Sequence, residues 1–192
     1  MAYNIKDVFY LSTEATIAAS TSNGGSAQLD LSAYIDPIQR GRQRGTGLAV
    51  YKVHFHIQNG SDAKSQPIDD AEVGVMSFGL QAGLGIGDVA TGGISATSAT
   101  YSATNSLLVA AGQFYGPKSQ VANANTTVSM FPNMSIMPST EVPYVIVRDN
   151  VCLTYQVSDQ FTESTLLSCR LECAQVSLDQ ATLNQLLRTQ TV

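Results

Sequence analysis

The chain has 192 residues, and only 13% of them are charged, against roughly a quarter in an average protein. This length fits one domain, residues 1–192, and the 44% of hydrophobic residues can form a sizeable core. A formal net charge of −5 argues against a protein that coats nucleic acid with its whole surface. The polar but mostly neutral composition favours a protein whose faces contact other protein faces.

The first residues contain Lys6 and Asp7 and no apolar run of signal-peptide length. Nowhere do about 18 consecutive apolar residues occur, which is the length that a membrane-spanning helix needs. We therefore expect synthesis in the cytoplasm. The pattern of residues 5–19 fits either a helical turn or a strand, and we predict a strand.

Strict alternation of apolar and polar residues predicts two half-buried strands. The first covers residues 27–35, and the second covers residues 51–58 and ends at the turn sequence Asn59-Gly60. Shorter segments at residues 71–78, 106–111 and 126–131 predict further strands. In the second strand one face carries Tyr51, Val53, Phe55 and Ile57, and the other carries Lys52, His54, His56 and Gln58.

Residues 143–148 and 151–157 are rich in Val, Ile and Tyr and are separated by Asp149-Asn150, which predicts a hairpin or one bent strand. Residues 166–176 alternate again and place Cys169 and Cys173 on the apolar face, so we predict that these thiols are buried and reduced. With Cys152 the cysteines are odd in number and lack paired CxxC spacing, which argues against a disulfide scaffold and a zinc site.

The last segment predicts a short helix. Ser177 is the expected N-cap, Gln180 stands three residues later, and one face carries Leu183, Leu186 and Leu187. The strand candidates number about eight to ten, with no helix predicted between them. The sequence therefore predicts an all-β fold, a single jelly-roll antiparallel β-sandwich of about eight strands with a short C-terminal helix.

Two segments, residues 79–97 and 112–125, are longer than ordinary connections between strands. Their apolar residues have no strand periodicity that would place them in the core. We therefore predict that both segments are buried at contacts between copies of the chain.

The sequence His54-Phe55-His56 places two imidazoles on one face of a strand, as in the H-x-H of jelly-roll cupins. Only these two histidines occur, so a complete cupin site cannot be built, although carboxylates could come from Asp62, Asp69, Asp70 or Glu72. We predict surface histidines, with no metal and no cofactor. A G-x-S-x-G motif is absent and no Ser-His-Asp set can be argued, so we predict no enzyme.

One basic patch, formed by Arg40, Arg42 and Arg44, follows the Asp36-Pro37 turn. It is the candidate binding site of the sequence, for contact with lipid head groups, nucleic acid or an acidic partner on an inner face. A solvated loop is the alternative, and three arginines are too few for strong nucleic-acid binding alone.

The sequence resembles single jelly-roll capsid proteins of icosahedral viruses. The resemblance lies in the two segments around the arginine patch, AQLDLSAYIDP and AVYKVHFHIQNG, and in the late Val/Ile-rich strands. In size the chain is similar to the small major capsid proteins of tailless, membrane-containing viruses. The resemblance implies a virion protein that assembles with copies of itself, with a second capsid protein, lipid membrane or genome as possible partners and no small-molecule substrate. A long basic N-terminal arm, as in plant-virus capsids, is missing, which puts direct genome packaging in doubt.

Two other functions fit the same fold. A carbohydrate-binding, lectin-like β-sandwich usually presents exposed Trp or Tyr for stacking on sugars, and this chain has eight Tyr but no Trp. A cupin-like metalloprotein is disfavoured by the incomplete ligand set.

Overall fold

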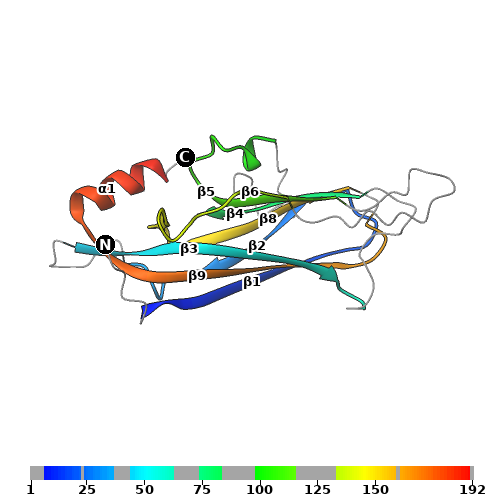
Figure 1. The fold of residues 1–192 in the computed structure, drawn as a ribbon, viewed down its shortest axis with the longest axis horizontal. Helices are drawn as coiled ribbons and strands as arrows, with labels where there is room; N and C mark the ends of the chain where they lie inside the picture. Colours follow the sequence, from blue (N-terminus) through cyan, green and yellow to red (C-terminus); the bar gives the residue numbers. More distant parts are fainter. Residues whose placement is uncertain are drawn as a thin grey trace.

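The computed structural model describes residues 7–22, 24–36, 44–62, 74–83, 98–115, 133–158 and 161–190. Within these ranges the chain forms strands and one helix at its C-terminal end (Figure 1). The strands are β1 (Phe9–Ile17), β2 (Gly24–Asp30), β3 (Arg44–Asn59), β4 (Val75–Ala82), β5 (Leu108–Tyr115), β6 (Asn133–Ile136), β7 (Tyr144–Ile146), β8 (Asn150–Val157) and β9 (Thr165–Asp179). A 3-10 turn, η3 (Ser98–Tyr101), precedes β5, and the helix α1 is Gln180–Thr189.

The strands form two antiparallel sheets, which lie one above the other in Figure 1. One sheet, here called the β9 sheet, has the order β1-β9-β3-β7, and the other, the β8 sheet, has the order β2-β8-β4-β5-β6. The chain passes back and forth between the sheets, and the first and last strands pair side by side. This is the strand order of a jelly roll, with β6 as an extra edge strand beside β5. The predicted jelly-roll β-sandwich with a C-terminal helix is confirmed.

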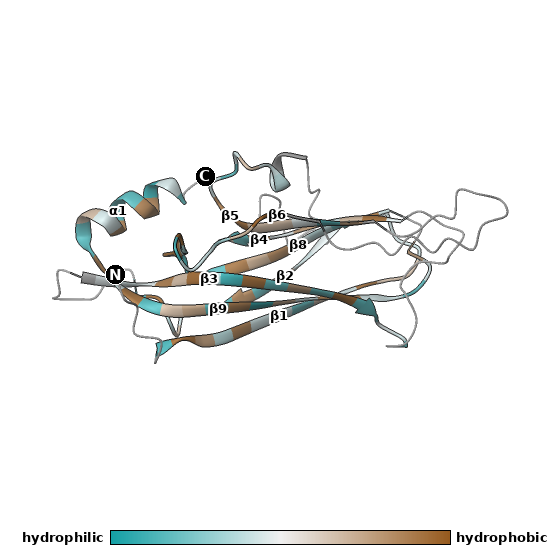
Figure 2. Ribbon diagram, viewed as in Figure 1, coloured by the Kyte–Doolittle hydropathy of each residue, from teal (hydrophilic) through white to brown (hydrophobic). Residues whose placement is uncertain are grey.

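The core lies between the sheets and is formed by the apolar side chains that alternate along the central strands. Brown and teal segments alternate along β3 and β9 in Figure 2, as expected for strands with one buried face. The rings of Phe55 and Phe78 meet across the core with centroids 4.9 Å apart. Fully buried members include Leu48, Val50, Val53, Met76, Leu80, Leu153, Phe161, Leu167 and Leu171.

The face predicted for Tyr51 is wrong, because a β-bulge lies at this residue. The pairing of β3 with β9 shifts between Val50 and Lys52, so Tyr51 is an extra residue that reverses the alternation. Tyr51 therefore packs with Ala49 and Ala174 in a separate cluster outside the main core, instead of sharing a face with Val53. Beyond the bulge, the predicted alternation of residues 52–58 is confirmed.

The strand predicted at residues 27–35 ends earlier, at Asp30. The side chain of Asp30 accepts a hydrogen bond from the Ser32 N–H (2.8 Å), which lowers the pKa of this carboxyl group and favours a turn over a continued strand. The N–H groups of Tyr34 and Ile35 then bond to the carbonyl of Leu31. Leu31 and Ile35 still reach the core, but from a turn.

Residues 143–157 form neither a hairpin nor one bent strand. β7 pairs with β3 in the β9 sheet, whereas β8 lies between β2 and β4 in the β8 sheet. The short connection after Ile146 therefore crosses from one sheet to the other. Local sequence cannot distinguish such a crossing from a tight turn, because both require a break in the strand at the same place.

The C-terminal helix begins later than predicted, because β9 continues to Asp179. Asp179, and not Ser177, is the N-cap, and its side chain accepts the Thr182 N–H at 2.7 Å. Leu183 is fully buried. At the other end the Gln190 side chain donates to the Val145 carbonyl (2.7 Å) and accepts from the Val147 N–H (3.2 Å), which fastens the helix to the β7–β8 connection.

The remaining predictions are confirmed in part. The N-terminal strand is present as β1, and the strand predicted at residues 106–111 is present as β5, which continues to Tyr115. Of residues 71–78, residues 75–78 belong to β4, and residues 71–73 lie outside the described residues, as do residues 126–131. The two predicted loops are shorter than expected, because residues 79–82 complete β4 and residues 112–115 complete β5. Residues 84–97 and 116–125 lie outside the described ranges.

No helix in the described part of the chain is both long and apolar enough to cross a membrane.

The thiols give a first test of the core. Cys152, Cys169 and Cys173 are buried and form no disulfide bond, and burial raises the pKa of Cys169 and of Cys173 to about 12. Because only the thiolate reacts quickly with disulfide reagents, we expect slow labelling of the native protein at pH 8 and rapid labelling of three thiols after denaturation. Fast labelling of Cys169 or Cys173 in the native protein would contradict this packing.

Two valines give a matched test of burial. Val53 on β3 is 0% exposed, whereas Val142 is 74% exposed. We expect Val53→Ala to lower the free energy of unfolding by about 2 kcal/mol, since it removes two buried methyl groups and leaves a cavity. Val142→Ala should change it by less than about 0.5 kcal/mol. Urea denaturation measures the free energy of unfolding of both variants. Equal losses would contradict the assignment of Val53 to the core and of Val142 to the surface.

Candidate functional site

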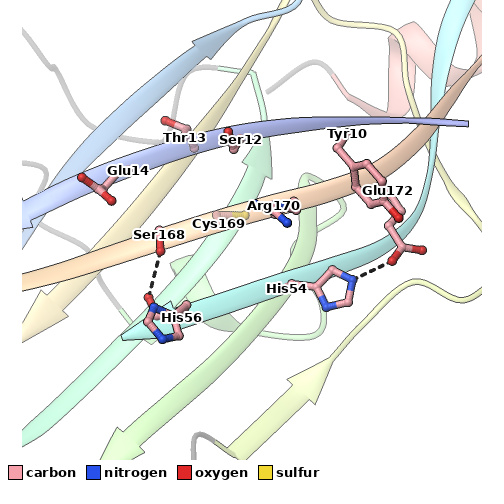
Figure 3. Close-up of a pocket in the computed structure, with 10 residues that line it drawn as sticks. All are labelled: Tyr10, Ser12, Thr13, Glu14, His54, His56, Ser168, Cys169, Arg170 and Glu172. Carbon is pink, nitrogen blue, oxygen red and sulfur yellow. Dashed lines mark hydrogen bonds and ion pairs between the residues drawn. The ribbon is translucent and has the colours of Figure 1, made fainter. Parts of the chain in front are cut away.

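A groove with a volume of about 810 Å³ lies on the outer face of the β9 sheet, on the side away from the core. Side chains from β1, β9 and β3 line it (Figure 3). Its lining residues are Tyr10, Ser12, Thr13, Glu14, His54, His56, Ser168, Cys169, Arg170 and Glu172.

Strand register explains why these side chains meet. Even-numbered residues of β1 and β9 alternate with core residues such as Leu171, so they face outward. On β3 the bulge at Tyr51 gives the even-numbered residues after it the same outward direction. Three rows of cross-strand neighbours result, and they are Tyr10–Glu172–Lys52, Ser12–Arg170–His54 and Glu14–Ser168–His56.

Two contacts organise the groove. The Nε2 atom of His54 lies 2.8 Å from Oε1 of Glu172, with side-chain exposures of 44% and 27%. The guanidinium carbon of Arg170 lies 5.9 Å from the centroid of the Tyr10 ring. The Glu172 carboxylate is therefore paired with the His54 ring. Among the described residues, no carboxylate lies within ion-pair distance of the Arg170 guanidinium.

The histidines occupy the outer face, as predicted, and both are exposed. Within the described ranges no group of three His, Cys, Asp or Glu side chains could share a metal ion. Of the carboxylates named as possible partners, Asp62 follows the end of β3, and Asp69, Asp70 and Glu72 lie outside the described residues. A cupin-type site between the sheets cannot use these histidines, because they point away from the core.

The arginine patch is only partly described. Arg40 and Arg42 lie outside the described residues, and the backbone of Arg44 begins β3 opposite Asp179. Sequence reasoning did not find the groove. The alternation showed which residues of each strand face outward, but nothing in the sequence indicated that β9 lies between β1 and β3.

The outer face of the β8 sheet is different, because the segment around η3 covers it. Thr100 is buried, and a Cβ atom on Gly79 of β4 would lie 3.2 Å from the Tyr101 ring. Gln81 is fully buried on this face, and burial raises the pKa of Tyr101. Gln81 and Thr154 on this face are thus enclosed, whereas His54, His56 and Arg170 on the outer face of the β9 sheet are exposed.

No family model and no curated protein matches the sequence. Among solved structures, the chain is similar to VP1 of Trichodysplasia spinulosa-associated polyomavirus, with a TM-score of 0.47 and 5% identity over 93% of this chain and 97% of that chain. Merkel cell polyomavirus VP1 gives a TM-score of 0.47 and 6% identity over 91% and 96%. Human polyomavirus 12 VP1 gives 0.38 and 6% over 90% and 99%. Because these scores are low, the jelly-roll assignment rests on the strand order of this chain.

Removing the histidines tests whether they have a structural role. An exposed ion pair contributes about 0–1 kcal/mol, so we expect the double variant His54→Ala/His56→Ala to fold, with a free energy of unfolding lowered by less than about 1 kcal/mol. Val53→Ala, between them on the same strand, is the control with a larger expected loss. Stoichiometric metal in the native protein that is lost in the double variant would instead support the cupin alternative.

Proposed function

We propose that the chain is a non-enzymatic structural protein that self-assembles into the shell of a viral capsid. The observation that carries the proposal is the jelly-roll strand order of the two sheets. Viral capsid proteins, lectins and cupins are the main classes that use this fold. The position of both histidines on the outer face argues against the cupin class.

Surface composition and sheet edges favour assembly. Only 13% of the residues are charged, so contact between copies involves little charge repulsion. Each sheet also has edge strands, and β1 pairs with β9 alone among the described strands. An edge strand offers unpaired N–H and C=O groups that a neighbouring molecule can cover.

We further propose a virion location, made in the host cytoplasm, and copies of the same chain as its main partners. A second capsid protein could complete the shell. On an inner face, Arg40, Arg42 and Arg44 could contact a lipid membrane, the genome or an acidic protein.

A lectin-like module is the second candidate, and the groove is the observation that favours it. The groove is polar and open, and it contains the exposed ring of Tyr10. A lectin need not assemble, whereas a shell protein must. The oligomeric state of the purified protein therefore separates the two functions.

Assembly is tested by shortening the two connections predicted to lie between copies. Residues 86–95 or 117–124 are replaced by a short Gly-Ser linker, and sedimentation velocity and electron microscopy follow the particles. We expect the intact protein to form oligomers or shells and both shortened variants to remain small, with far-ultraviolet circular dichroism still rich in β-structure.

The double variant His54→Ala/His56→Ala is the control and should assemble like the intact chain. If the intact protein stays monomeric at high concentration and the shortened variants behave identically, the shell function is wrong and the lectin-like function replaces it.

A further inference from the structure

We propose that the groove on the outer face of the β9 sheet binds an acidic saccharide, with Arg170 as the ligand of its anionic group and Tyr10 as the surface for a sugar ring. This inference goes beyond the shell function and does not depend on assembly, since every residue in it belongs to one copy of the chain.

Arg170 is the anion-binding element. It stands in the central row of the groove, between Ser12 and His54, and its side chain is exposed. Glu172, its neighbour in the adjacent row, is engaged by His54 at 2.8 Å. Because no carboxylate in the described part of the chain pairs with Arg170, its N–H donors can form a bidentate contact with a carboxylate or sulfate group.

Tyr10 supplies an apolar surface beside this cation. Tyr10 is 62% exposed, and it lies at one end of the groove on the edge strand β1. An aromatic ring that also carries a hydroxyl group can pack against the apolar face of a sugar and hydrogen-bond at its rim. Because Arg170 lies near the Tyr10 ring, a single ligand can place its anionic group on Arg170 and its sugar ring against Tyr10.

The other lining residues suit a polyhydroxylated ligand. Ser12, Glu14, His56 and Ser168 offer donors and acceptors across a face that measures roughly 10 Å across the strands and 14 Å along them. The lining has no apolar pocket of the kind that anchors a peptide side chain, because its only other apolar member, Cys169, is buried.

Surface plasmon resonance tests the proposal with three immobilised probes: a sialylated lactose, which carries a carboxylate; a sulfated lactose; and neutral lactose. We expect the intact protein to bind at least one acidic probe and to bind lactose much more weakly. Arg170→Ala should weaken binding of that probe about tenfold or more, since two charge-assisted hydrogen bonds are lost. Arg170→Lys should retain part of the affinity.

Matched variants separate the groove from the rest of the surface. Arg188→Ala removes an exposed arginine on α1 and should bind like the intact chain. Ser12→Tyr fills the centre of the groove without removing its charge and should also abolish binding. Sedimentation of each variant reports assembly separately from binding.

Equal binding of lactose and the acidic probes would overturn the role of Arg170. Unchanged affinity in both Arg170→Ala and Ser12→Tyr would place any binding outside the groove and overturn the site. Absence of binding to all three immobilised probes at the highest protein concentration would overturn the proposal as a whole, and it would leave the assembly experiment unaffected.

Discussion

The pairing of β3 with β9 is the interaction on which the rest of the structure depends. These two central strands pair from Arg44 opposite Asp179 to Asn59 opposite Thr165. On the inner side they supply a large part of the core, and on the outer side they supply two of the three strands of the groove. A change of register by one residue would move every side chain of one strand to the opposite face.

The bulge at Tyr51 divides the outer face of this pair into two halves. Before it, Ala49 and Tyr51 pack with Ala174 in an apolar cluster. After it, Lys52, His54 and His56 face outward and are exposed. One extra residue thus lets a single strand contribute to an apolar cluster at one end and to a polar groove at the other.

The groove also concentrates charge in a chain that has little of it. Glu14, Arg170 and Glu172 line it from the adjacent strands β1 and β9. Elsewhere the polar but mostly neutral surface suits contact between copies, and the segment around η3 covers Gln81 and Thr154 on the outer face of the β8 sheet.

The sequence by itself determined the all-β class, the burial of Cys169 and Cys173, the outward histidines and the short helix, because alternation and helical spacing are local properties of the chain. It also indicated the end of β3 at Asn59-Gly60. It did not determine that the strand predicted at residues 27–35 ends at Asp30, because the hydrogen bond between the Asp30 side chain and the Ser32 N–H produces the turn there.

Only the tertiary structure decided that β7 and β8 belong to different sheets, that Asp179 caps the helix, and that Tyr10, Arg170 and His54 share one groove. These features depend on which strands are neighbours. Residues 10, 54 and 170 are far apart in the sequence, and hydrogen bonds between β1, β9 and β3 bring them together. Alternation fixes the face of a side chain within its strand, whereas strand pairing fixes its neighbours.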